Sequence, residues 1–326
     1  MTTAPLYRDQ QAWTDLQEFL PERLRLDEST VPAEEFWRWR GNRIHLDRFS
    51  RPEASARVVL HHGVGTNGRQ MSLILGAPLA RRGYDVVSLD NLGFGMTEVG
   101  PGFAPSYADW VDLVGDFLAA EQARDPKPTV LFGLSAGGML AFHVAAKAPA
   151  GTLHGIVGMT FLDQRYREVR ERTARSRQTA RIGAPIMAAV AKTPLGRLRY
   201  PMRLASKMSA LANDPGAMEV LLGDPTSAGN AVPLRFLADY LSYAPAIEPE
   251  RFRACPVLLT QPAEDRWSPR ELSDPVVSRL DPALFEEVSL QGAGHLPLED
   301  PGLRRLEVAV AEFVDRVTSW TRTPAR

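Results

Sequence analysis

Short apolar runs alternate with amphipathic stretches along most of this chain, and no other feature of the sequence constrains its fold more. Short strand-like runs predict strands at 56–62, 85–89, 129–134, 155–160, 256–260 and 285–290, and the apolar run at 56–62 predicts a buried one. Helix-like stretches lie between or after them, at 70–82, 107–122, 136–146, 269–280 and 303–320. Buried strands separated by helices imply right-handed βαβ units and a largely parallel sheet. We therefore predict an α/β fold.

Two regions depart from this alternation. The first 34 residues are polar and punctuated by prolines, and we expect an N-terminal arm or helix there. Residues 35–49 then alternate with a period of two around Gly41-Asn42, which predicts an antiparallel hairpin. Residues 163–247 are helix-like and repeatedly broken by prolines, so a helical insertion in the sheet domain is the simplest interpretation.

Composition narrows the class of protein. The 38 basic and 39 acidic residues leave a net charge of -1, which argues against a nucleic-acid partner. The single cysteine, Cys255, excludes an intramolecular disulfide. No apolar run approaches the length of a membrane span, and the first residues lack the features of a signal peptide. We expect a cytoplasmic enzyme without stable membrane insertion, as a monomer or homodimer.

The most specific motif is Gly133-Leu134-Ser135-Ala136-Gly137, which fits G-x-S-x-G. A strand-like run precedes it and a helix-like run follows it, which is the context this motif requires. Small residues are needed on both sides of a serine in so sharp a turn. Ser135 would then stand at a helix N-terminus, where a developing negative charge is favoured. The alternative is a glycine-rich turn with an N-cap serine.

A nucleophilic serine needs a base and an acid that orients the base. Of the six histidines, His295 lies in a loop after the last strand, at the carboxyl ends of the sheet. The others lie in the hairpin, at strand ends or in the helix after Ser135. Glu264 and Asp265 follow the preceding strand, and Asp163 follows an earlier one and competes with them. The chain order serine, acid, histidine favours Asp265.

The loop after the first parallel strand, His62-Gly63-Val64-Gly65, completes the candidate site. Its glycines would let a backbone N–H approach the reacting oxygen, so we expect an oxyanion hole formed by the N–H groups of Val64 and Ala136. A plain turn at the end of a strand is the alternative.

With Asp90-Asn91-Leu92-Gly93-Phe94-Gly95 after the next strand, these motifs resemble the α/β-hydrolase-fold serine hydrolases. The resemblance covers roughly 35–160 and 250–320, and is closest to capped esterases, monoacylglycerol lipases and lysophospholipase-like members. It implies an eight-stranded, mostly parallel sheet flanked by helices, with a lid after the sixth strand. A serine at the elbow argues against epoxide hydrolases and haloalkane dehalogenases, which carry aspartate there.

The insertion at 163–247 would be this lid, placed between core segments 35–162 and 248–326. We expect it to be separable from the catalytic residues and to set acyl-chain preference. Its first part is rich in arginines, which predicts a solvated helix face, while attraction of an anionic substrate or membrane surface is the alternative. Trp267, two residues after the proposed acid, would line the substrate pocket or plug the lid interface.

We therefore expect a serine hydrolase that cleaves small-molecule carboxylic esters through Ser135, His295 and Asp265, with an acyl-enzyme intermediate. No cluster of metal ligands is apparent in the sequence, so no metal or other cofactor is expected. Thioester, amide, lactone or carbon–carbon bond hydrolysis on the same triad stays open, as does a ligand-binding homologue with little turnover, because fold alone does not decide function.

Overall fold

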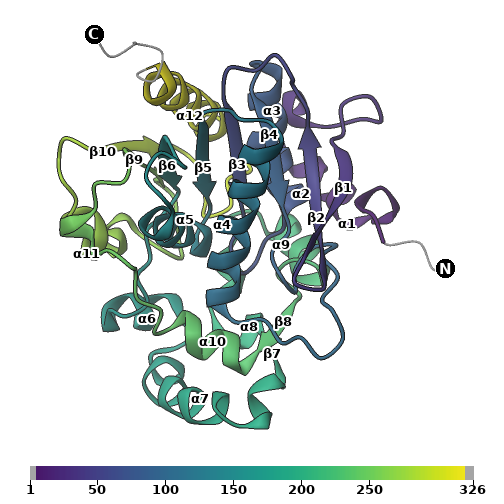
Figure 1. The fold of residues 1–326 in the computed structure, drawn as a ribbon. Helices are drawn as coiled ribbons and strands as arrows, with labels where there is room; N and C mark the ends of the chain where they lie inside the picture. The colour runs from purple at the N-terminus through teal and green to yellow at the C-terminus, as the bar shows by residue number, and fades with distance from the viewer. Residues whose placement is uncertain (1–4, 320–326) are drawn as a thin grey trace.

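A single eight-stranded sheet forms the centre of the computed structural model, which describes residues 5–319 (Figure 1). Its strands, in spatial order, are β1 (Ala33–Trp39), β2 (Asn42–Phe49), β4 (Asp85–Leu89), β3 (Arg57–His61), β5 (Thr129–Gly133), β6 (Gly155–Gly158), β9 (Val257–Pro262) and β10 (Phe285–Leu290). The pairs β1–β2 and β2–β4 are antiparallel, and all other neighbours are parallel. The predicted α/β fold is confirmed.

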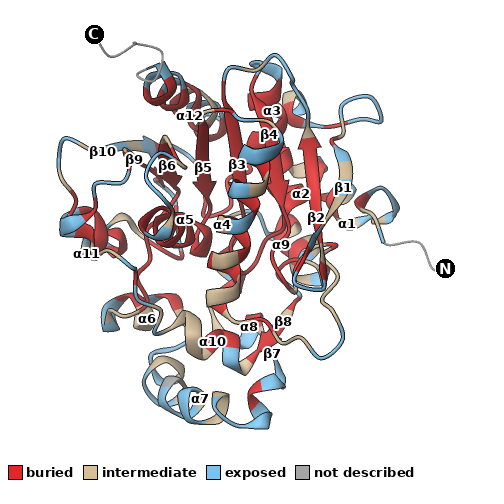
Figure 2. Cartoon of the chain, in the orientation of Figure 1, coloured by how far each residue is buried: buried red, intermediate tan, exposed pale blue. Residues whose placement is uncertain are grey.

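Helices cover both faces of the sheet. One side carries α4 (Tyr107–Arg124) and α5 (Ala136–Lys147), and the other carries α2 (Gly68–Met71), η4 (Ser72–Gly76), α3 (Ala77–Arg81) and α12 (Gly302–Ser319) (Figure 1). The short η9 (Arg270–Ser273) and α11 (Asp274–Val277) connect β9 to β10. Every residue of β3, β4, β5, β6 and β9 is buried, as a doubly covered sheet requires (Figure 2). Continuous apolar runs are therefore typical of these strands.

The N-terminal arm consists of short helical turns, η1 (Tyr7–Asp9), α1 (Ala12–Leu16), η2 (Gln17–Phe19) and η3 (Glu22–Leu24). The hairpin that follows turns one residue earlier than predicted. Arg40 and Gly41, with φ of 44° and 80°, form the turn, and Asn42 is already the first residue of β2. The reason is that Asn42 Nδ2 donates to the Trp39 carbonyl at 3.1 Å, which closes the turn from the strand side.

The insertion lies between β6 and β9, beyond the carboxyl ends of the parallel strands (Figure 1). Its helices are α6 (Arg167–Thr173), η5 (Thr179–Gly183), α7 (Ala184–Ala191), η6 (Pro194–Arg197), α8 (Met202–Ala205), η7 (Met208–Ala210), α9 (Pro215–Gly223) and α10 (Leu234–Tyr240), with η8 (Pro249–Arg251) after them. An antiparallel pair, β7 (Arg199–Pro201) with β8 (Ala231–Pro233), was not expected, because three-residue strands carry no readable period. No helix in residues 5–319 is both long and apolar enough to cross a membrane.

Candidate active site

Ser135 lies in the turn between β5 and α5, and its backbone conformation is strained. Its φ is 57°, a value that only one other non-glycine residue described here, Arg40, shares in sign. The turn is crowded on both sides. A Cβ at Gly133 would lie 1.9 Å from the Gly137 carbonyl oxygen, and one at Gly138 would lie 2.0 Å from the Thr160 carbonyl oxygen. Only glycine fits there, as a sharp strand-to-helix elbow demands.

The structure brings Asp265 and His295 together, although 30 residues separate them. His295 Nδ1 lies 2.8 Å from Asp265 Oδ2, and both side chains are almost fully buried. Burial alone would raise the pKa of Asp265, but the charge and hydrogen bond of His295 and the hydrogen bonds from Ser268 outweigh it. The pKa of Asp265 therefore lies below its ordinary value. An ionised carboxylate can only accept, so Nδ1 of His295 carries the proton and Nε2 is free to act as a base.

Ser268 is a member of this cluster that the sequence analysis did not identify. Its hydroxyl donates to Asp265 Oδ2 at 2.8 Å and lies 2.9 Å from His295 Nδ1. Its backbone N–H also donates to Asp265 Oδ1, as does that of Trp267. The carboxylate is thus held by backbone and side chain on both oxygens. A serine three residues after an acid is an ordinary loop feature, so no local signal distinguishes it.

The second ring nitrogen of His295, Nε2, has no partner within the described chain. Nε2 is buried and makes no hydrogen bond within residues 5–319. No hydrogen bond joins it to the Ser135 hydroxyl in this part of the chain. The indole of Trp267 lies against the imidazole, with ring centroids 4.7 Å apart, and both Trp267 and Ser135 line one cavity. In substrate-free enzymes the bond between nucleophile and base is often long and tightens when substrate binds.

The predicted oxyanion loop lies directly against the elbow. A Cβ at Gly63 would be 3.0 Å from Ser135 Cβ and 3.5 Å from the backbone nitrogen of Ala136. The side chain of Val64, the next residue, lines the same cavity as Ser135. Among the described residues, the N–H groups of Val64 and Ala136 have no acceptor. Two unpaired donors beside a serine are what an oxyanion hole requires.

The other candidate acids do not contact His295. Asp163 pairs with Arg165 at 2.7 Å, and the same guanidinium reaches Glu248. The side chain of Glu264 is exposed to solvent. Of the three carboxylates that follow the two strands, only that of Asp265 is hydrogen-bonded to the imidazole.

The paired histidines at the end of β3, His61 and His62, stabilise the loops next to the site. His61 Nε2 lies 2.7 Å from Asn91 Oδ1, and the Asn91 N–H donates to His62 Nε2 at 2.9 Å. Burial lowers the pKa of both imidazoles, so they stay neutral near pH 7. They join the loop after β3 to the loop after β4 and are not exposed to the cavity.

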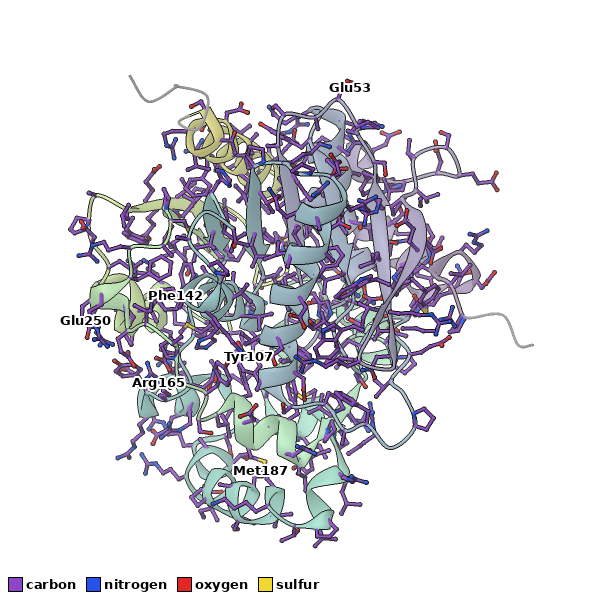
Figure 3. All side chains as sticks on the ribbon, viewed as in Figure 1. Glu53, Tyr107, Phe142, Arg165, Met187 and Glu250 are labelled. Carbon is purple, nitrogen blue, oxygen red and sulfur yellow. The ribbon has the colours of Figure 1, made fainter. Side chains whose placement is uncertain are left out.

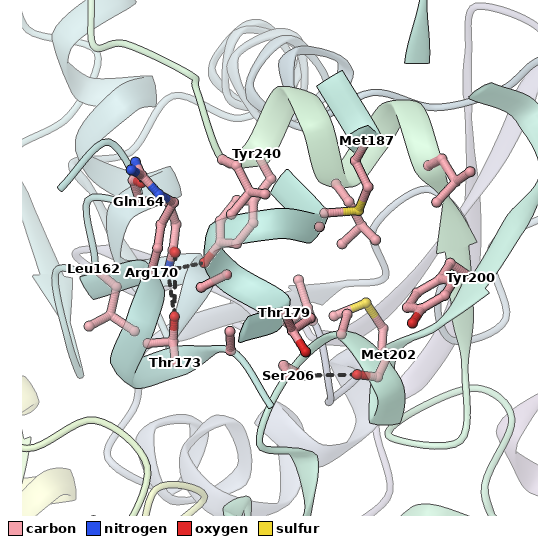
Figure 4. Close-up of a pocket in the computed structure, with 18 of the residues that line it drawn as sticks. Leu162, Gln164, Arg170, Thr173, Thr179, Met187, Tyr200, Met202, Ser206 and Tyr240 are labelled. Carbon is pink, nitrogen blue, oxygen red and sulfur yellow. Dashed lines mark hydrogen bonds between the residues drawn. The ribbon is translucent and has the colours of Figure 1, made fainter. Parts of the chain in front are cut away.

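A cavity of about 340 Å³ extends from Ser135 into the insertion, and most of the residues that line it are apolar (Figure 4). Met187, in the part of the insertion farthest from the sheet in Figure 3, lies on its far wall. Among the polar residues of the lining, Gln164 Nε2 donates to Thr173 Oγ1 at 3.4 Å and to the Tyr240 hydroxyl at 3.3 Å. Trp267 lines the cavity and also donates from Nε1 to the Thr173 carbonyl at 3.0 Å. Trp267 thus contacts both the cavity and the insertion.

One group of side chains in residues 5–319 has the composition of a metal site, and it lies away from the elbow. Ligand atoms of Glu34, His45 and Asp47 lie within 4.8 Å of one another. The guanidinium of Arg69 already pairs with Asp47 at 2.7 Å and lies 3.5 Å from Glu34. Because this cation neutralises the carboxylates, the group does not suit a metal ion.

Comparisons with known proteins agree with this geometry. The sequence model described as the alpha/beta hydrolase family matches residues 58–306. A monoacylglycerol lipase from Paleococcus ferrophilus is 20% identical with a TM-score of 0.66, covering 87% of this chain and 99% of that one. A soluble variant of the monoglyceride lipase from Saccharomyces cerevisiae is 19% identical with a TM-score of 0.70, covering 90% and 98%.

An esterase from Rhodococcus sp. ECU1013 is 20% identical with a TM-score of 0.60, covering 88% of this chain and 99% of its own. At these identities the structures establish a shared fold. No curated protein matches the sequence.

Proposed function

Because this chain belongs to the alpha/beta hydrolase family, we propose that it is a serine hydrolase that cleaves carboxylic esters. The observation that carries the proposal is the buried hydrogen bond between Asp265 and His295, beside an apolar cavity that Ser135 lines. An ionised acid behind an imidazole, a serine at a strained elbow and two unpaired N–H groups are the parts that acyl transfer needs.

In the first half-reaction, Nε2 of His295 takes the proton of the Ser135 hydroxyl while Oγ attacks the ester carbonyl carbon. The carbonyl oxygen becomes an oxyanion, which the N–H groups of Val64 and Ala136 stabilise. His295 then gives its proton to the leaving alcohol, the ester C–O bond breaks and an acyl-enzyme forms. Asp265 keeps the imidazole oriented and stabilises its positive charge throughout.

In the second half-reaction, water takes the place of the alcohol. His295 accepts a proton from the water, whose oxygen attacks the acyl carbon, and a second oxyanion forms in the same hole. The proton returns to Ser135 Oγ as the carboxylic acid is released. The apolar lining of the cavity favours a substrate whose acyl group is a hydrocarbon, because burial of apolar surface drives its binding.

Active-site labelling tests this proposal directly. The wild type should react with a fluorophosphonate and turn over p-nitrophenyl esters, and Ser135→Ala should lose the label and at least about a thousandfold in kcat. The matched control is Ser278→Ala, which removes a serine hydroxyl that donates to the Asp274 carbonyl, outside the cavity. Ser278→Ala should take the label and turn over esters as the wild type does. Chelators should not change the activity of the wild type or of Ser278→Ala. Turnover of Ser135→Ala within about tenfold of the wild type would refute the assignment.

A further inference from the structure

The part of the insertion between α9 and β8 lies against the candidate oxyanion loop, far from the outer end of the lid. In Figure 1, α9 lies near α1 and α2, whereas α7 lies at the far end of the insertion. Ser227, which is fully buried, donates from Oγ to the Gly65 carbonyl oxygen at 2.8 Å. It also accepts a hydrogen bond from Gln70 Nε2 at 2.9 Å. These contacts join residues 162 and 157 positions apart in the sequence.

Ser227 is itself held in a tight turn. Its N–H donates to the Asp224 carbonyl at 3.1 Å, and the Asn230 N–H donates to the Ser227 carbonyl at 3.1 Å. The neighbouring Thr226 adds two further contacts with the core. Its hydroxyl accepts from Asn67 Nδ2 at 3.1 Å, and its carbonyl accepts from the Gly95 N–H at 3.0 Å. These contacts therefore fix the position of the Ser227 hydroxyl.

Two hydrogen bonds bracket Val64. On one side, the Gly63 N–H donates to Thr66 Oγ1 at 3.0 Å, and on the other, Ser227 holds the Gly65 carbonyl. Glycine on both sides would otherwise let the peptide groups of this loop rotate easily. A Gly65 carbonyl without its donor would be a buried acceptor with no partner, which costs enough to favour rotation toward another donor. The Gly65 carbonyl shares its peptide group with the Thr66 nitrogen, so such a rotation would displace Thr66, whose Oγ1 accepts the Gly63 N–H. The backbone from Gly63 to Gly65 would then shift and move the Val64 N–H away from the oxyanion.

We propose that Ser227 is a positioning residue for the oxyanion hole, supplied by the insertion and acting through the Gly65 carbonyl. The inference rests on the proposed function and deepens it. The catalytic loops would then not be complete without the insertion.

The segment from η7 to β8 also contacts the histidine loop. The Leu296 N–H, next to His295, donates to the Leu211 carbonyl at 2.7 Å, and Asn213 Nδ2 donates to the Glu264 carbonyl at 3.2 Å. Met208 packs against the oxyanion loop so closely that a Cβ at Gly65 would lie 2.4 Å from its sulfur. Residues 208–230 thus support both catalytic loops, while the remaining parts of the predicted lid enclose the cavity.

The test compares Ser227→Ala with Ser242→Ala, an exposed serine of the insertion whose hydroxyl donates to the Ala238 carbonyl near the end of α10. Ser227→Ala should lower kcat on a p-nitrophenyl ester by about ten- to a hundredfold and leave KM within about twofold, since loss of the donor itself costs 10²–10³. Ser242→Ala should leave both constants unchanged.

A transition-state mimic separates positioning from general damage. A trifluoromethyl ketone adds to the serine and forms a tetrahedral oxyanion, so its Ki should rise by the same factor as kcat falls. If the alanine variant does not fold, Ser227→Cys takes its place, because cysteine is nearly isosteric but a poor donor. It should likewise lower kcat and leave KM within about twofold. Ser227→Thr, which keeps the hydroxyl, should recover kcat.

Either of two results would overturn the inference: an unchanged kcat in folded Ser227→Ala and Ser227→Cys, or a loss of kcat with an unchanged Ki of the ketone. Both leave the proposed function standing, because the wild type is active in both. A wild type that turns over no ester and takes no fluorophosphonate label would refute the proposed function, and this inference would fall with it.

Discussion

Replacing Asp265 with asparagine tests the proposed acid sharply, because the hydrogen bonds to its carboxylate allow the amide only one orientation. Oδ1 accepts the backbone N–H groups of Trp267 and Ser268, both at 2.8 Å. Oδ2 faces His295 Nδ1 and the Ser268 hydroxyl. The amide oxygen must therefore take the Oδ1 position, since an NH₂ group there would meet two N–H donors.

In that orientation the asparagine NH₂ donates to His295 Nδ1. The imidazole proton must then sit on Nε2, which can no longer accept the proton of Ser135. A triad whose histidine carries its proton on the wrong ring nitrogen loses about 10⁴-fold in kcat. At 1.36 kcal/mol for each factor of ten, this corresponds to about 5.4 kcal/mol in the activation free energy.

The assay is kcat on a p-nitrophenyl ester, with Asp163→Asn as the matched control. Asp163 is also buried in the carboxyl-end loops, but its carboxylate pairs with Arg165 and contacts no histidine. We expect its kcat to stay within about tenfold of the wild type. If Asp163→Asn proves the more damaging change, or if Asp265→Asn keeps kcat within about tenfold, the assignment of the acid is wrong.

Two further predictions concern stability and the cavity. Burial would lower the pKa of His45, but hydrogen bonds and charge from Asp90 and Glu34 raise it from 6.5 to about 9. The protonated imidazole therefore stabilises the fold fully below about pH 6.5, and this contribution is lost as pH rises through 9. As the pH rises from 7 to about 9.5, the thermal midpoint of unfolding should decrease in the wild type and decrease much less in His45→Gln. An equal dependence of the midpoint on pH in the two proteins would contradict this. Met187→Trp should fill the far wall of the cavity and lower kcat/KM for long acyl esters relative to acetate, by about 1–3 kcal/mol for each excluded methylene. Leu195→Trp, at a lid residue 55% exposed, should leave the chain-length profile unchanged, and a shift of equal size in both variants would argue against the cavity as the acyl site.

Much of the fold could be predicted from the sequence because its signals are local. A strand covered on both faces is buried along its whole length, and the predicted run at 85–89 matches β4 in full. The predicted run at 285–290 also matches β10, although only Leu290 of this edge strand is buried. The elbow at Ser135 could be predicted for the same reason, since the crowding that demands Gly133 comes from Gly137, close by in the sequence. The crowding at Gly138 comes from Thr160, after β6, and is a tertiary contact. Even so, the turn of the first hairpin is displaced by one residue, because the Asn42 side chain closes it.

The tertiary structure decided which side chains meet. Chain order favoured Asp265 over Asp163 and Glu264, and the packing of two loops shows that Asp265 is the one bonded to His295. Ser268 joins that pair without any local signal. Ser227 contacts the Gly65 carbonyl across 162 residues. Periodicity records which face of an element is buried, whereas a hydrogen bond between distant loops depends on how the whole chain packs, and no local pattern encodes it.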